Sequence, residues 1–159
     1  MSAEEISEFY KEYYQKFGIP LQKEWKPFPH IKEAKKKLKI VYVSPDFKKR
    51  PAQNFLLPTL AHHDHQKFEI FAFAELEKED NFSQEYKSYV DHWIPTKNLS
   101  DNDLVAKIRE SQIDILVDLA GHTKGNGLEA FMYKPAPISV SWWVGFGYTT
   151  GSVSYTHLT

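Results

Sequence analysis

The chain has no cysteine among its 159 residues, so disulfide bonds and thiolate metal sites are excluded. It carries almost no net charge, because 20 lysine and arginine residues are balanced by 21 aspartate and glutamate residues. A general attraction to nucleic acid or to an anionic membrane is therefore not expected. Apolar runs of about 18 residues and a signal-peptide pattern are also missing, which makes a cytoplasmic protein the default prediction.

Hydrophobic residues make up 42% of the chain, enough for one domain that buries roughly 70% of its unfolded surface. From Leu38 onward, strand-like and helix-like segments alternate, and this alternation predicts an α/β fold with a parallel sheet and right-handed crossovers. Ser100 and Asp103 have the spacing of a capping box at the start of one of the helices. We expect strands at 38–43, 68–74, 92–94, 113–119 and 138–144, and helices at 53–62, 83–90, 101–110 and 128–133.

Residues 1–37 are expected to form an N-terminal helix and a linker ahead of the domain at 38–151. An aromatic stripe at i, i+3 and i+4 spacing predicts a helix over Ala3–Phe17 that packs one face on another part of the molecule. Gly18 is the expected helix stop. Pro20–His30 contains three prolines without periodicity, which is typical of a linker.

Residues 152–159 do not continue the pattern that precedes them. Val153–Thr159 resembles a reading frame through a sequencing adapter. We therefore predict a non-native tail and expect the natural protein to continue beyond about Gly151.

The run Ile113–Leu119 is apolar and β-branched, as expected for a strand that is buried on both faces of a parallel sheet. It ends abruptly in Gly121, His122 and Thr123. In open α/β sheets, ligands bind just outside the carboxyl ends of the strands. The sequence therefore predicts a small-molecule site at this loop.

His122 is the candidate acid–base or ligand contact, because an unperturbed imidazole titrates at about 6.5. Its structural alternative is a loop histidine that caps the following helix. Thr123 and Lys124 can bind sugar or phosphate oxygens, with a solvated loop lysine as the alternative for Lys124. Asp118 either orients the loop by accepting backbone N–H bonds or binds the sugar, and we favour the first. The N–H of Gly121 is a further candidate ligand contact.

A second glycine-rich loop follows the strand at 138–144, and its candidate ligand contacts are Gly147, Thr149 and Thr150. Backbone N–H groups in such loops can bind phosphate or sugar oxygens. Two loops of this kind, after two strands of one sheet, open onto the same edge. The cluster His62-His63-Asp64-His65 contains standard zinc ligands, but adjacent residues rarely face one ion, so no metal site is predicted.

Several segments, in order and at fitting spacing, resemble the catalytic region of the O-linked N-acetylglucosamine transferase family, which includes SPINDLY-like proteins. The segments are Leu38–Phe47, His62–Asp64 with Phe68–Phe71, Ile115–Lys124, Lys134–Ile138, Trp142 and Gly145–Gly151. The resemblance implies a Rossmann-like N-terminal lobe of a two-lobed GT-B glycosyltransferase. It also implies upstream tetratricopeptide repeats and a missing C-terminal lobe, which would bind most of the nucleotide sugar.

The activity implied by the resemblance is transfer of N-acetylglucosamine from UDP-GlcNAc to Ser or Thr of a protein or peptide acceptor, without a further cofactor. His122 is the catalytic candidate in this lobe. Where the family usually carries a histidine, this chain has Arg50, which stays protonated and cannot act as a base but can bind a diphosphate. The alternatives are protein O-fucosyl transfer and a non-catalytic α/β interaction domain.

Overall fold

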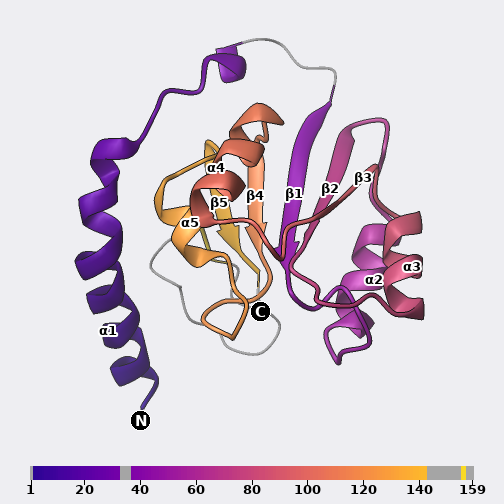
Figure 1. Cartoon of the computed structure of the whole chain (residues 1–159), viewed down its shortest axis with the longest axis horizontal. Helices are drawn as coiled ribbons and strands as arrows, with labels where there is room; N and C mark the ends of the chain where they lie inside the picture. Colours follow the sequence, from indigo (N-terminus) through magenta and orange to yellow (C-terminus); the bar gives the residue numbers. More distant parts are fainter. Residues whose placement is uncertain (1, 33–36, 143–154, 157–159) are drawn as a thin grey trace.

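The computed structural model describes residues 2–32, 37–142 and 155–156 of the chain. Its centre is a parallel sheet of six strands in the order β3-β2-β1-β4-β5-β6 (Figure 1). The strands are β1 (Leu38–Ser44), β2 (Phe68–Ala74), β3 (His92–Pro95), β4 (Ile115–Asp118), β5 (Ile138–Ser141) and β6 (Tyr155–Thr156). The α/β architecture with a parallel sheet expected from the sequence is confirmed.

The chain builds the sheet outward from β1 in two directions. It runs first to β2 and β3, and then returns to place β4 on the other side of β1, with Val41 opposite both Phe71 and Leu116. The strand order therefore reverses between β1 and β4. In doubly wound sheets, ligands bind at the carboxyl ends of the strands at this reversal.

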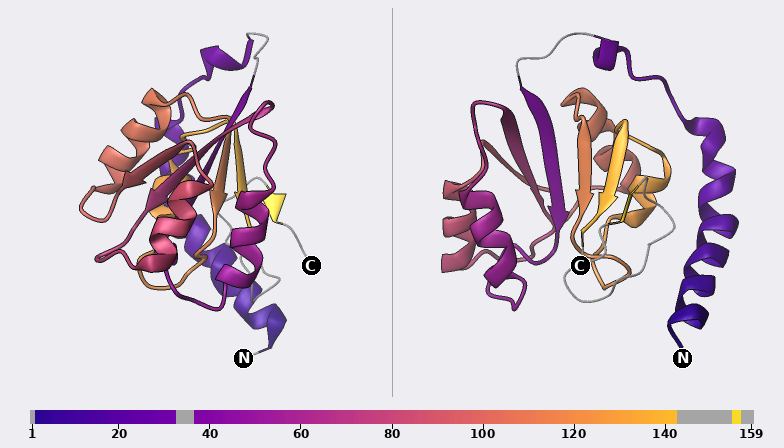
Figure 2. Two further views of the ribbon diagram at one scale, coloured as in Figure 1. Left: turned by 90° about the vertical axis from the view of Figure 1, so that its right-hand side faces the viewer. Right: turned by 180° about the vertical axis from the view of Figure 1, so that it is seen from behind.

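Helices cover both faces of the sheet, and β1 shows why. Alternate side chains of a strand point to opposite faces, so Ile40 and Tyr42 pack under α2 (Gln53–Ala61) and α3 (Asn81–Ser88). Val41 and Val43 pack under α4 (Asp101–Glu110) and α5 (Leu128–Met132). Figure 2 shows the sheet between these two layers. The uninterrupted apolar run Ile40–Val43 in β1 is the consequence of burial on both sides.

Helix starts follow local capping chemistry. The predicted capping box of α4 is confirmed, with the Ser100 hydroxyl accepting from the N–H of Asp103. In α3, Asp80 is the N-cap and its carboxylate accepts from the N–H of Ser83. Because Asp80 supplies this cap, α3 begins and ends two residues earlier than expected.

The N-terminal segment is helical over the whole predicted range, but only its first part is regular α-helix. α1 (Ala3–Tyr13) continues as a π-helical turn, η1 (Tyr14–Gly18), and two 3-10 turns, η2 (Ile19–Glu24) and η3 (Pro29–Lys32), follow. Gly18 is buried against the Tyr14 ring, at a position where a Cβ would overlap that ring. The close approach explains why a glycine stands where the regular helix has given way.

The predicted linker is bound along the domain rather than free of it. The indole N–H of Trp25 donates to the carbonyl of Met132 at 2.9 Å, and the Lys134 ammonium lies 4.7 Å from the Trp25 ring centre. The Arg109 guanidinium lies 5.4 Å from the ring of Phe28. These contacts hold the linker against α4 and the end of α5. α1 runs along the α5 side of the domain (Figure 1).

Part of the predicted tail adds to the sheet. Tyr155 and Thr156 pair in parallel with Val140 and Ser141 as β6. The non-native origin predicted for the tail stays a prediction. Within the described part of the chain, no helix is long and apolar enough to cross a membrane.

We expect Leu116→Asp to abolish cooperative folding. Leu116 is fully buried at the centre of the sheet, and an unpaired carboxylate is strongly disfavoured there. Urea unfolding followed by circular dichroism measures the effect. Leu38→Asp is the matched control, because Leu38 is 43% exposed at the start of β1. Wild-type-like cooperative unfolding of Leu116→Asp would contradict the central place of β4.

Candidate functional site

The candidate site lies at the carboxyl ends of β1 and β4, where two loops leave the sheet side by side. One loop joins β1 to α2 and carries Asp46 and Arg50, and the other joins β4 to α5 and carries His122. A hollow of about 20 Å³, the size of one water molecule, lies between them. Its lining residues are Ser44, Asp46, Ala52, Leu56, Leu119 and Trp142. This hollow is therefore too small to enclose a ligand much larger than a water molecule.

Asp118 holds the start of the β4–α5 loop. Its side chain is buried, and its carboxylate accepts from the N–H groups of Ala120 at 2.9 Å and Gly121 at 3.1 Å. The Ser141 hydroxyl lies 3.4 Å away on β5. Burial raises the pKa of Asp118 to about 6, although these hydrogen bonds act in the opposite direction. This geometry fits the loop-orienting role, whereas sugar binding by Asp118 stays a prediction.

The rest of this loop is closed by its own short-range hydrogen bonds. The Thr123 hydroxyl donates to the carbonyl of Ala120 at 2.7 Å, and the Asn126 amide donates to the carbonyl of Thr123 at 2.6 Å. Gly125 has a φ of 83°, and a Cβ there would lie 3.4 Å from Pro45 in the neighbouring loop. Left-handed backbone favours glycine. The two loops are thus in contact through a position that needs glycine.

His122 packs against the N-terminal helix. Its imidazole is stacked on the Tyr10 ring at a centroid distance of 4.1 Å and an interplanar angle of 15°. The Tyr13 ring meets it edge-on at 5.3 Å and 85°. Thr123 and Lys124 beside it are exposed, so their side chains are available for ligand contacts. The sequence indicated that α1 packs on something, but the partner was not predictable because about 110 residues separate the two segments.

Arg50 lies on the β1–α2 loop, half-exposed, with its Nε 3.3 Å from the Asp46 carboxylate. α3 fixes this loop from the side. The Asp80 carboxylate accepts from the N–H of Lys49 at 2.9 Å, and the buried Ser83 hydroxyl donates to the carbonyl of Phe47 at 2.7 Å. The guanidinium is therefore held at the same sheet edge as the β4–α5 loop.

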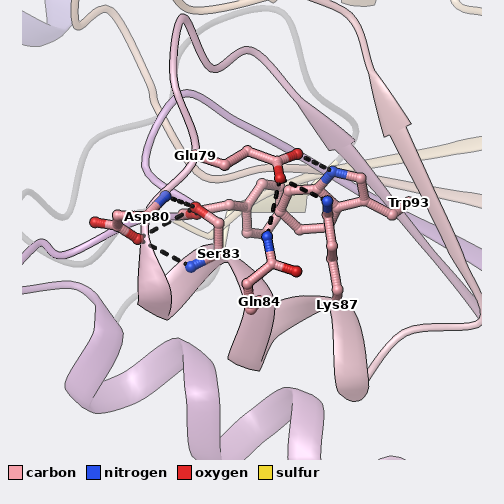
Figure 3. Close-up of polar contacts among 7 residues, drawn as sticks. Glu79, Asp80, Ser83, Gln84, Lys87 and Trp93 are labelled. Carbon is pink, nitrogen blue, oxygen red and sulfur yellow. Dashed lines mark hydrogen bonds and ion pairs between the residues drawn. The ribbon is translucent and has the colours of Figure 1, made fainter.

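A network centred on Glu79 fixes α3 itself (Figure 3). The carboxylate accepts from Lys87 Nζ at 2.6 Å, Trp93 Nε1 at 3.0 Å and Gln84 Nε2 at 3.1 Å. The bond from Lys87 makes the largest contribution to lowering the pKa of Glu79. Because Trp93 belongs to β3, the network joins α3 to the outer strand. It thereby fixes the helix that binds the β1–α2 loop.

The histidines at the end of α2 contact three different partners. His62 Nδ1 donates to the carbonyl of Pro58 at 2.7 Å, and His63 Nε2 shares a 2.8 Å hydrogen bond with the Tyr42 hydroxyl. His65 Nδ1 lies 3.0 Å from the carboxylate of Asp91. Among the residues that the structure describes, no group of histidine and acidic side chains has the arrangement of a metal site.

The structure brings Asp118, Gly121, His122, Thr123 and Lys124 together on one loop and Arg50 onto the loop next to it. Their roles in binding and catalysis stay predictions. The candidates of the second glycine-rich loop, Gly147, Thr149 and Thr150, lie outside the described residues.

We expect Asp118→Asn to change the pH dependence of stability. The pKa of Asp118 in the folded state, about 6, exceeds its ordinary value of 3.8, so the folded chain binds this proton more tightly than the unfolded chain. The wild-type therefore loses stability as pH rises from about 4 to about 6, by up to about 3 kcal/mol at about 1.4 kcal/mol per pKa unit. Asparagine does not titrate, and its amide oxygen can still accept from the loop.

Urea-unfolding free energies between about pH 4 and pH 8 measure this difference, with the exposed Glu110→Gln as the control. The free energy of unfolding of Asp118→Asn should increase relative to that of the wild-type as pH rises. The free energy of unfolding of Glu110→Gln should change with pH in the same way as that of the wild-type. Parallel profiles for the wild-type and Asp118→Asn would contradict the prediction.

The chain is similar to several known proteins. It is 30% identical over 135 residues to the probable UDP-N-acetylglucosamine–peptide N-acetylglucosaminyltransferase SPINDLY of Arabidopsis thaliana, covering 82% of this chain and 15% of that protein. It is 33% identical over 152 residues to the corresponding SEC protein of the same plant, covering 90% of this chain and 15% of that protein. A solved structure of a Thermobaculum terrenum O-GlcNAc transferase mutant aligns with a TM-score of 0.87 at 26% identity, covering 98% of this chain and 30% of that chain.

The chain thus spans about 15% of the length of the curated relatives that it matches. The resemblance noted in the sequence is confirmed by these relatives, and the shared parallel sheet places it in the catalytic region of such proteins. The model of glycosyl transferase family 41 matches residues 15–158, and the chain therefore belongs to glycosyl transferase family 41.

Proposed function

We propose that this chain forms the N-terminal lobe of a protein O-glycosyltransferase, and that the longer protein transfers N-acetylglucosamine from UDP-GlcNAc to Ser or Thr hydroxyls. A protein glycosyltransferase is what the family and the names of the relatives support. The observation that carries the proposal is the position of the β4–α5 loop, which carries His122. The loop is held by hydrogen bonds to the buried Asp118 carboxylate and lies where the strand order reverses.

In this reaction, the acceptor hydroxyl oxygen forms a bond to the anomeric carbon of the sugar. The bond from that carbon to the diphosphate breaks, and UDP leaves with the electron pair. The hydroxyl proton must be lost, and the charge on the leaving diphosphate must be stabilised. His122 is proposed to accept or orient this proton. Arg50 is proposed to attract the diphosphate, since its guanidinium stays charged.

The second lobe of the longer protein is proposed to supply the base-binding contacts and most of the diphosphate contacts. A hollow of about 20 Å³ between the two loops cannot hold a nucleotide sugar, which is consistent with a site shared by two lobes. Catalysis requires reacting atoms held about 3–3.5 Å apart, and one wall alone does not fix them. Upstream helical repeats are part of the same proposal.

We expect His122→Ala to lower kcat of the longer protein by roughly 100-fold, the effect of removing a group that carries a proton in the transition state. Radiolabelled UDP-GlcNAc and a Ser/Thr peptide provide the assay. His62→Ala is the matched control, because His62 is an exposed histidine at the end of α2. An unchanged kcat for His122→Ala would leave His122 as a loop residue.

The isolated chain is expected to transfer no sugar, and the longer protein is expected to do so. Parallel assays with UDP-GlcNAc and GDP-fucose decide the donor. Transfer from GDP-fucose alone would replace the proposed donor, and transfer from neither would favour a non-catalytic interaction domain. Transfer by the isolated chain would contradict the shared-site argument.

A further inference from the structure

His122 contacts α1, a distant part of the chain, through two aromatic rings. Two tyrosines one helical turn apart, Tyr10 and Tyr13, meet the same imidazole from two directions. Residues three apart lie on one face of a helix, so a single docked helix brings both rings to His122. The contact joins the first helix of the chain to the loop that follows β4.

The two tyrosine rings differ in their orientation relative to the imidazole. The Tyr10 ring is nearly parallel to the imidazole at 4.1 Å, so it covers one face of that ring. The Tyr13 ring is nearly perpendicular to the imidazole at 5.3 Å, so it makes a second contact in a different orientation. A ring held by one parallel and one perpendicular neighbour has a preferred tilt as well as a preferred position. Together the two tyrosines select one orientation of the His122 side chain.

The backbone under His122 is fixed separately. Asp118 binds the N–H groups of Ala120 and Gly121, and the Thr123 hydroxyl binds the carbonyl of Ala120. The loop therefore has a defined backbone without α1. What α1 adds is control of the imidazole, which is the part of the residue that would act in catalysis.

His122 also remains within reach of a ligand. An open groove of about 360 Å³ lies beside it, and its lining residues are Phe9, Tyr10, Glu12, Tyr13, Lys16 and His122. The imidazole is partly buried rather than enclosed. The tyrosines thus contact His122 while leaving it next to open space.

We propose that Tyr10 and Tyr13 are positioning residues for His122, so that the helix preceding the α/β domain is a functional part of the transfer site. The proposal rests on the proposed function for the use of His122 in transfer. The orientation of the imidazole by the two tyrosines can be tested without that function. A purely structural role, in which His122 merely anchors α1, predicts a different outcome in the kinetic test below.

The first test uses the chain itself and the proton NMR signals of the His122 ring. In the wild-type, the stacked Tyr10 ring should shift these signals upfield and give nuclear Overhauser contacts between the two rings. Tyr10→Leu should remove both effects, whereas Tyr10→Phe should keep them because it retains the stacked ring. Phe55→Leu, which removes an exposed aromatic ring from α2, should change neither. Unchanged His122 signals in Tyr10→Leu would overturn the proposal.

The second test uses the longer protein and the peptide-transfer assay. Tyr10→Leu and Tyr13→Leu should each lower kcat by roughly tenfold or more with little change in KM for the nucleotide sugar, because misplacing a reacting group chiefly slows the chemical step. Tyr10→Phe should restore kcat, and Phe55→Leu should retain it. If His122 only anchors α1, kcat should be unchanged in the leucine variants that remain folded by circular dichroism. That result would overturn the proposal.

The two tests separate the two claims. If the wild-type longer protein transfers no sugar, the proposed function fails, and the NMR result alone decides whether the tyrosines hold the imidazole. If the wild-type protein transfers sugar and Tyr10→Leu does so at the same kcat, the proposed function stands and the positioning role is wrong.

Discussion

The candidate site depends on one buried carboxylate. Asp118 ends β4 almost without solvent contact, and removing a carboxylate from water is costly unless its oxygens find donors. The donors here are the N–H groups at the start of the loop, so the same hydrogen bonds compensate the buried carboxylate and fix the loop backbone. The raised pKa of Asp118, at about 6, shows that burial outweighs these donors.

The β1–α2 loop, which carries Arg50, is held by side chains at the start of α3. Asp80 and Ser83 of α3 bind the backbone at Lys49 and Phe47, and the Glu79 network fixes α3 to β3. Gly125 then meets Pro45, which brings the two loops into contact. A guanidinium and an imidazole are thus presented at one sheet edge by two supports that share no hydrogen bond among those described.

The N-terminal segment has more contact with the domain than a linker would need. Trp25 and Phe28 bind next to cationic side chains at the end of α5 and on α4, and α1 reaches His122 beyond them. In a family 41 protein, this segment lies where any preceding part of the chain would join the catalytic lobe. Through the stacking of Tyr10 on His122, this segment directly contacts the loop that carries the candidate residues.

The sequence by itself determined the alternation of strands and helices, the capping box of α4, and the placement of polar loops after buried strands. These features follow from neighbouring residues: β-branched runs, a serine followed three residues later by an acidic residue, and glycines at strand ends. Local chemistry was also enough to favour the loop-orienting role of Asp118, because its donors are two and three residues away.

Only the tertiary structure decided where α1 binds, that Tyr10 and Tyr13 meet His122, and that the predicted linker lies against the domain. The bond from Trp25 to Met132 spans 107 residues, and the two rings on His122 come from a segment just as distant. An amphipathic stripe predicts that a helix buries one face, but the surface on which the helix packs forms only when the sheet has folded. For this reason, the loops that carry the candidate residues could be predicted from the sequence, whereas the helix that packs on His122 could not.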